Sequence, residues 1–166
     1  MGGRGAGGSA KLPSSGSRNS NGLGVSKSTD KELQSRIWLA EDMANRFKAD
    51  IDKANKALKE VDKKSSTYEG IKKARAEVTQ MYNQKVNNLK QYYAEVDKRI
   101  KSTQAEYDKV SKEYSEVAKA LNYTNSNTAR SEFDRLSEKR RKLQNKLTQL
   151  KSMQKKTTRT GDNPLF

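Results

Sequence analysis

The basic residues near the end of the chain form the group best suited to binding another molecule. The run from Lys139 to Arg159 contains nine of them and no acidic residue. On a helix, Lys139, Lys142 and Lys146 follow one another at i, i+3 and i+7 and therefore share one stripe. Such a one-sided row of cations predicts nonspecific binding to the phosphate backbone of DNA or RNA, driven by counterion release. The predicted contact residues are Lys139, Arg140, Arg141, Lys142, Lys146, Lys151, Lys155, Lys156 and Arg159.

Three other interpretations of this basic run stay open: an acidic protein partner, an anionic membrane surface, and a basic helix that is merely solvated. Base-specific reading is not predicted, because no helix-turn-helix, zinc finger or zipper-borne basic region accompanies the run. Stacking of bases on tyrosine is not predicted either. Four of the seven tyrosines fall on an apolar helical stripe, where they are expected to fill a seam between helices: Tyr82, Tyr93, Tyr107 and Tyr114.

A group of large apolar residues predicts a second contact surface. Trp38 and Leu39 lie beside the apolar stripe of the first predicted helix, with Met43 one turn beyond Leu39. They widen the apolar face there, which indicates either a contact within the chain or a patch that binds a protein partner. Tyr92 and Tyr93 are expected to lie close to them. The predicted partner-binding residues are Trp38, Leu39, Met43, Tyr92 and Tyr93.

No catalytic, cofactor or metal site is predicted. The chain has no histidine and no cysteine, which removes the usual general base near neutral pH, the commonest metal ligand and any thiol chemistry. Carboxylates such as Asp50 and Asp52 are spread along helix faces beside lysines, where no pocket for acid–base catalysis is expected. The chain is therefore predicted not to be an enzyme and to bind no small molecule.

Composition favours helices with thin seams over a globular core. Only 31% of the residues are hydrophobic, and the formal net charge is +15, which favours anionic partners. No apolar run is long enough for a signal peptide or a transmembrane helix, so a cytoplasmic protein is expected.

A heptad repeat predicts one long central helix. Between residues 71 and 121 there is neither Gly nor Pro, and apolar or aromatic residues recur in steps of three and four. The repeat runs through Tyr82, Val86, Leu89, Tyr93, Val96, Ile100, Thr103, Tyr107, Val110, Tyr114, Val117 and Leu121. Thr103 is its one polar position. The predicted fold is all-α, an elongated antiparallel coiled coil in which two shorter helices flank this helix of ~50 residues.

The segment boundaries follow from caps and composition. Helices are expected over about 31–63, 67–122 and 128–156, within a coiled-coil domain of residues 31–156. Capping boxes at Thr29-x-x-Glu32 and Ser66-x-x-Glu69 are expected to start the first two. Residues 1–30 predict a disordered, Gly/Ser-rich basic arm, and residues 157–166 a flexible tail. A parallel dimer through the long seam and a compact three-helix bundle are the competing arrangements.

Folding the two shorter helices back onto the long one predicts where they meet. The first helix would place Ile37 and Trp38 near Tyr92, and the third would place Met153 near Asp97. The two helices would then cover successive halves of the long helix and scarcely overlap, with Trp38, Leu39 and Met43 clustered against Tyr92 and Tyr93 at the junction. Arg140 falls on the third helix's seam, where its stem packs while its head reaches solvent, or where it sets the register.

The opening Met1-Gly2-Gly3-Arg4-Gly5, followed by small residues, resembles the start of tailed-bacteriophage head-morphogenesis and minor structural proteins. This resemblance implies a phage particle protein without enzymatic chemistry. The predicted function is accordingly a structural or assembly protein, with its basic third helix contacting nucleic acid or an acidic partner. The alternatives are a stand-alone nonspecific nucleic-acid-binding protein, or a coiled-coil adaptor that pairs or self-associates through its heptad seams.

Overall fold

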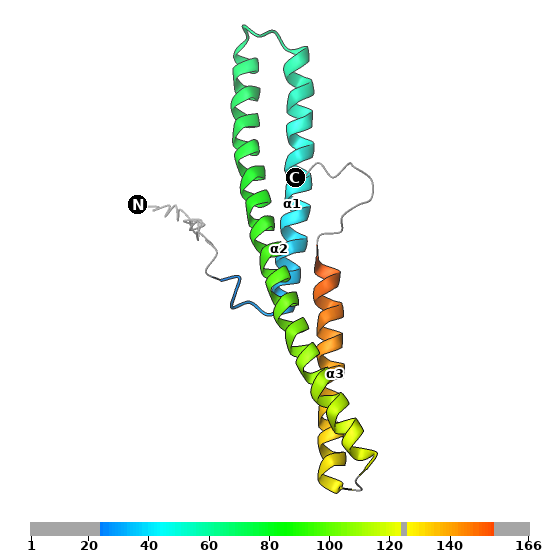
Figure 1. Cartoon of the computed structure of the whole chain (residues 1–166). Coiled ribbons are helices and arrows are strands. Elements are labelled where there is room, and N and C mark those ends of the chain that lie inside the picture. The colour runs from blue at the N-terminus through cyan, green and yellow to red at the C-terminus, as the bar shows by residue number, and fades with distance from the viewer. Residues whose placement is uncertain (1–23, 124–125, 155–166) are drawn as a thin grey trace, which may run out of the picture.

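The computed structural model describes residues 24–123 and 126–154 and contains three helices in that part of the chain, with no strand. They are α1 (Asp30–Glu60), α2 (Ser66–Leu121) and α3 (Asn127–Met153). Helix α1 lies along one half of α2 and α3 along the other, so that the molecule is a long rod (Figure 1). The predictions of an all-α chain with three helices and of two shorter helices flanking a long one are confirmed.

The first capping box forms as predicted. The Thr29 backbone N–H donates to the Glu32 carboxylate over 2.7 Å, and the Glu32 N–H donates to the Thr29 hydroxyl over 3.2 Å. These two bonds satisfy donors that have no partner within the helix. Glu32 consequently has a lowered pKa, mainly through the hydrogen bond from the Thr29 backbone.

The second predicted capping box is wrong by one residue. The N-cap of α2 is Ser65, whose hydroxyl accepts from the Tyr68 N–H over 3.1 Å. The same hydroxyl donates to the Asp62 carbonyl over 2.7 Å, and the Asp62 carboxylate accepts from the Lys64 N–H over 3.0 Å. These bonds close the turn around Ser65, so Ser66 becomes the first helical residue.

The helices also end slightly earlier than expected, at Glu60, Leu121 and Met153. Val61 already has an extended backbone, with φ −96° and ψ 140°. Gln154 leaves the helical path as well, and its side-chain amide donates to the Asp97 carboxylate of α2 over 2.9 Å. This contact places the end of α3 beside Asp97, as the expected fold-back of the third helix requires.

Burial along α2 follows the heptad. The fully covered positions are Leu89, Val96, Thr103 and Val110, which are spaced seven residues apart. Thr103 is buried although it is the one polar residue of the repeat. The tyrosines of the alternate seam positions, such as Tyr107, are half-buried between them. The periodicity therefore identified the packed face of α2 correctly.

The buried residues form two clusters. The junction cluster joins all three helices, and the second joins α2 to α3. The junction cluster contains Leu33, Ile37, Ala40 and Ala44 of α1, Leu89 and Val96 of α2, and Leu150 and Met153 of α3. Helices α1 and α3 touch each other only there. The expected meeting of the two shorter helices on the middle of α2 is thus confirmed.

Part of the predicted arm is folded. Val25 is buried in the junction cluster, and Ser28 is buried beside it, with its hydroxyl donating to the Val25 carbonyl over 2.6 Å. The prediction of a disordered arm is therefore wrong for residues 24–29, because one valine among Gly and Ser produces no periodic signal. Residues 1–23 and the predicted tail, 157–166, lie outside the described residues.

Candidate functional site

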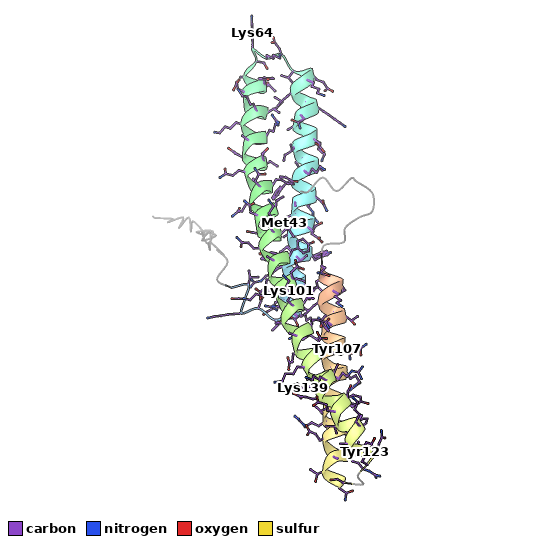
Figure 2. The ribbon with its side chains drawn as sticks, viewed as in Figure 1. Met43, Lys64, Lys101, Tyr107, Tyr123 and Lys139 are labelled. Atoms are coloured by element: carbon purple, nitrogen blue, oxygen red, sulfur yellow. The ribbon has the colours of Figure 1, made fainter. Side chains whose placement is uncertain are left out.

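Helix α3 displays the six described residues of the basic run, but they differ in what surrounds them. Lys139 reaches across to α2, where its Nζ lies 3.1 Å from the Glu106 carboxylate. Figure 2 shows Lys139 and Tyr107 on the same part of the rod, where α2 and α3 lie together. Lys139 therefore forms an exposed ion pair with α2 as well as contributing to the surface charge.

Arg141 and Lys142 share one carboxylate. The Arg141 guanidinium donates to Glu138 through two bonds of 2.9 and 3.0 Å, and the Lys142 Nζ lies 3.4 Å from the same side chain. The hydrogen bond from Arg141 is the main reason that the pKa of Glu138 is lowered. Glu138 immediately precedes the acid-free run, so counting charges within the run overlooked it. The two cations still exceed the one carboxylate that they contact.

Arg140 packs at the seam and stacks on tyrosines. Its Cζ lies 5.7 Å from the ring centre of Tyr107 and 5.2 Å from that of Tyr114, and its Nε donates to the Tyr107 hydroxyl over 3.3 Å. A guanidinium over aromatic faces gains cation–π attraction. The hydrogen bond from Arg140 is also the main cause of a lowered pKa at Tyr107. Arg140 is therefore part of the helix interface, and its guanidinium is already occupied.

Lys146 and Lys151 are the two described cations of the run that remain exposed without an ion pair to any described residue. Lys155, Lys156 and Arg159 lie outside the described residues. In total, the six described cations of the run have two carboxylates as ion-pair partners among the described residues, Glu106 and Glu138. The surface stays positive, but its freely available charge lies toward the end of α3 that meets the junction.

The predicted apolar patch is not assembled as expected. Trp38 and Leu39 were expected to pack against Tyr92 and Tyr93, yet their relative exposures are 68% and 53%. The reason is angular: successive helical residues point about 100° apart, so a seam through Ile37 directs Trp38 away from α2. Trp38 and Leu39 are therefore wrongly predicted as members of the junction core.

The tyrosines of the patch do pack at the junction. Tyr92 and Tyr93 are half-buried against the junction cluster, and Met43 is half-buried on α1. The Tyr93 hydroxyl donates a short hydrogen bond to the Glu41 carboxylate of α1. Burial first, and then this bond and the charge of Glu41, raise the pKa of Tyr93 far above its ordinary value. These residues are structural, which leaves Trp38 and Leu39 as the exposed part of the patch.

The most connected polar residue is Arg99 of α2, which the sequence did not single out. Its guanidinium donates to Asp30 over 2.7 Å and to Glu95 over 3.0 Å. It also donates to the backbone carbonyls of Val25 and Ser28 over 3.0 and 2.8 Å. Burial disfavours the charge of Arg99, but the bonds to Asp30 and Glu95 outweigh burial and raise its pKa. Arg99 thus fastens residues 25–30 to the middle of the rod.

Within residues 24–123 and 126–154 no group of side chains has the composition of a metal site, and no helix there is long and apolar enough to cross a membrane. Comparison with protein-family models, curated proteins and solved structures finds no match for this chain. The function of the chain is therefore inferred from its own residues.

Proposed function

We propose that the protein is a non-enzymatic structural or assembly component, built as two antiparallel coiled-coil hairpins that share α2. The seven-residue spacing of the buried positions of α2 supports this packing. So do the contacts of Tyr93 with Glu41 and of Tyr107 with Arg140, which join α2 to a different helix in each half. The resemblance of residues 1–5 to phage head-morphogenesis proteins supports a role in a phage particle.

Helix α3 is proposed to bind the phosphate backbone of nucleic acid without sequence preference. The supporting observation is that the six described cations of the run pair with only two carboxylates, and that Lys146 and Lys151 are exposed and unpaired among the described residues. Each phosphate contact of this kind releases condensed counterions, so binding should weaken steeply with salt. An acidic protein surface is the alternative partner for the same cations.

The test is a fluorescence-anisotropy titration of the full chain with a random-sequence DNA duplex at low and high salt. K146Q/K151Q should lower the affinity and reduce the salt slope by up to about two, since each lost phosphate contact contributes about one. The matched control is K112Q/K119Q, which removes two exposed lysines of α2 that form no ion pair with any described residue. Equal loss in both variants, or no binding at low salt, would contradict the role of α3.

A second candidate function is that of an adaptor, and the exposure of Trp38 and Leu39 favours it. Both side chains are large, apolar and exposed to water. Burying them against a protein partner or a second copy of the chain would therefore be favourable. Sedimentation equilibrium of the wild type and of W38S/L39S tests self-association through this patch. Association that is unchanged in the variant would remove the patch as its cause.

A further inference from the structure

The end of the rod formed by α1 and α2 gathers a second set of cations. The turn between the helices brings residues 56–64 beside the first turns of α2 (Figure 1). Seven basic residues, all exposed, lie within residues 56–75: Lys56, Lys59, Lys63, Lys64, Lys72, Lys73 and Arg75. The part of α2 that belongs to this group is only about 15 Å long at 1.5 Å per residue. We call residues 56–75 the α1–α2 tip, and Figure 2 shows Lys64 at its extremity.

The carboxylates of the tip do not neutralise these cations. The tip contains Glu60, Asp62 and Glu69. Only Glu69 forms an ion pair there, with Lys72 at 3.6 Å, and that pair is exposed. The Asp62 carboxylate accepts the Lys64 backbone N–H instead of an ammonium group. Six of the seven cations therefore form no ion pair with any residue that the structure describes.

The opposite end of the rod is electrically balanced. Residues 112–135, around the turn from α2 to α3, contain four basic and four acidic residues. Arg135 there donates to the Glu132 carboxylate. Figure 2 shows Tyr123 at this end, and Tyr123 is 88% exposed. Both ends of the rod are connections between two helices, yet they differ in charge. The charge of the α1–α2 tip is therefore not a general feature of this rod.

We propose that the α1–α2 tip is a second binding surface of this protein and that it contacts the phosphate backbone of nucleic acid. Its seven cations are exposed and close together, and six of them form no ion pair with any described residue, as counterion-releasing phosphate contacts require. The site does not depend on α3: Arg140 lies opposite Tyr107, which puts Lys146 level with about residue 101 of α2. That level is about 50 Å from Ser66 along a helix rising 1.5 Å per residue.

The side-chain types at the tip favour nucleic acid over a membrane or an acidic protein. The large apolar residues exposed in the described part of the chain are Trp38, Leu39, Met81 and Tyr123, and none belongs to the tip. A surface without exposed apolar groups has nothing to insert into a bilayer. Six of the seven cations are lysines, a residue type depleted from protein–protein interfaces but common as a point charge beside phosphate.

The experiment titrates the full chain into a fluorescein-labelled random-sequence duplex at about 50 and about 200 mM salt. The tip variant is K63Q/K64Q/K73Q. Its control is K109Q/K112Q/K119Q, which removes three exposed lysines of α2 near the other end, none of them in an ion pair within the described part of the chain. All six side chains are exposed, so glutamine should preserve the helices, and far-UV circular dichroism checks this. The tip variant should lose about tenfold or more in affinity at the lower salt, with a salt slope smaller by up to about three.

Three results would overturn the proposal. These are a tip variant that binds like the wild type, a tip variant and control that lose equal affinity, and a wild type that does not bind DNA at the lower salt. Binding to phosphatidylserine vesicles that depends on the tip, with DNA binding unaffected, would assign the tip to membranes instead. K146Q/K151Q in the same titration separates the two surfaces. If only K146Q/K151Q loses affinity, the tip proposal fails and the α3 proposal stands. If only the tip variant loses affinity, the α3 proposal fails and the tip proposal stands.

Discussion

Arg99 in the middle of α2 and Asp30 in the first turn of α1 form an ion pair of 2.7 Å, and only 15% and 19% of their side chains are exposed. The pair lies where the chain enters α1 and where α3 ends. Its arginine also binds Glu95 and the carbonyls of Val25 and Ser28. One side chain therefore joins α2 to the start of α1 and to the segment before it.

Replacing Arg99 by methionine should destabilise the protein markedly. R99M would deprive the Asp30 and Glu95 carboxylates and the backbone carbonyl of Ser28, all of them shielded from solvent, of the donor that Arg99 supplies. We expect a loss of about 2 kcal/mol or more in the free energy of unfolding, measured by urea denaturation.

The control for R99M is R135M, which breaks an ion pair of similar length with Glu132 that lies in solvent. Exposed pairs contribute little, so R135M should unfold at nearly the wild-type urea concentration. If the two variants lost equal stability, the junction network would be no stronger than a surface ion pair.

Truncating Ile37 should destabilise the protein, whereas truncating its neighbour Trp38 should have little effect on stability. Ile37 is buried in the junction cluster, so I37A should cost about 2–4 kcal/mol in the free energy of unfolding. Trp38 is mostly exposed, so W38A should change it by less than about 0.5 kcal/mol. Urea denaturation measures both.

Fluorescence can measure the exposure of Trp38 directly, because it is the only tryptophan of the chain. An exposed indole should emit and be quenched by acrylamide much like free tryptophan in water. A blue-shifted, protected emission in the monomer would mean that the side chain is covered, and W38A should then cost more than an exposed residue does.

The sequence predicts the packed face of α2 well and the neighbours of that face poorly. Leu89, Val96 and Val110 are found by periodicity because each repeats the same direction along one helix. Trp38 is wrongly placed by the prediction because the size and apolarity of a side chain do not say in which direction it points from the helix. Its position next to the buried Ile37 does give that direction.

The polar contacts of Arg99 and of the basic run could not be predicted from the sequence, because most of the partner residues lie in other segments of the chain. Arg99 looks like a solvated charge beside the seam, with Glu95 four residues before it as the only sequence hint. Its other partners come from residues 25–30, which show no periodicity. The run from Lys139 appears unopposed only because Glu106 lies on another helix and Glu138 just outside the run.

Tyr93 should make stability fall above pH 10. Its pKa is raised from the ordinary value of 10.0 in the folded protein, whereas the unfolded chain ionises near 10.0. The phenol therefore stays protonated longer in the folded state, so its stabilising contribution is complete below pH 10.0 and declines as the pH rises above that value. Y93F has no ionisable group and should show a smaller decline between about pH 9 and about pH 11 in urea denaturation.

Y123F is the control for the pH experiment, because it removes the same group from an exposed position. It should follow the wild-type pH dependence, including the part that arises from the lysines. A Y93F protein with the wild-type slope would show that Tyr93 ionises at the same pH in both states.

Substitutions at Arg140 separate the contribution of its charge to stability from that of its planar shape. Its guanidinium lies over the rings of Tyr107 and Tyr114, a planar contact that an ammonium cannot reproduce. R140K should therefore lower the free energy of unfolding by about 0.5–1 kcal/mol, whereas R141K, at an exposed pair with Glu138, should be near neutral. R140M should be at least as stable as R140K, since an apolar side chain suits a seam position even without the hydrogen bond to Tyr107.

The two substitutions at Arg140 also decide between packing and register. If the arginine sets the alignment of α3 on α2, R140M should keep its stability but sediment as a mixture of species, because an apolar seam no longer penalises shifted or intermolecular pairings. If it only fills space, R140M should stay homogeneous in sedimentation velocity. A less stable R140M than R140K would show that the positive charge between the two tyrosines matters more than the plane of the guanidinium.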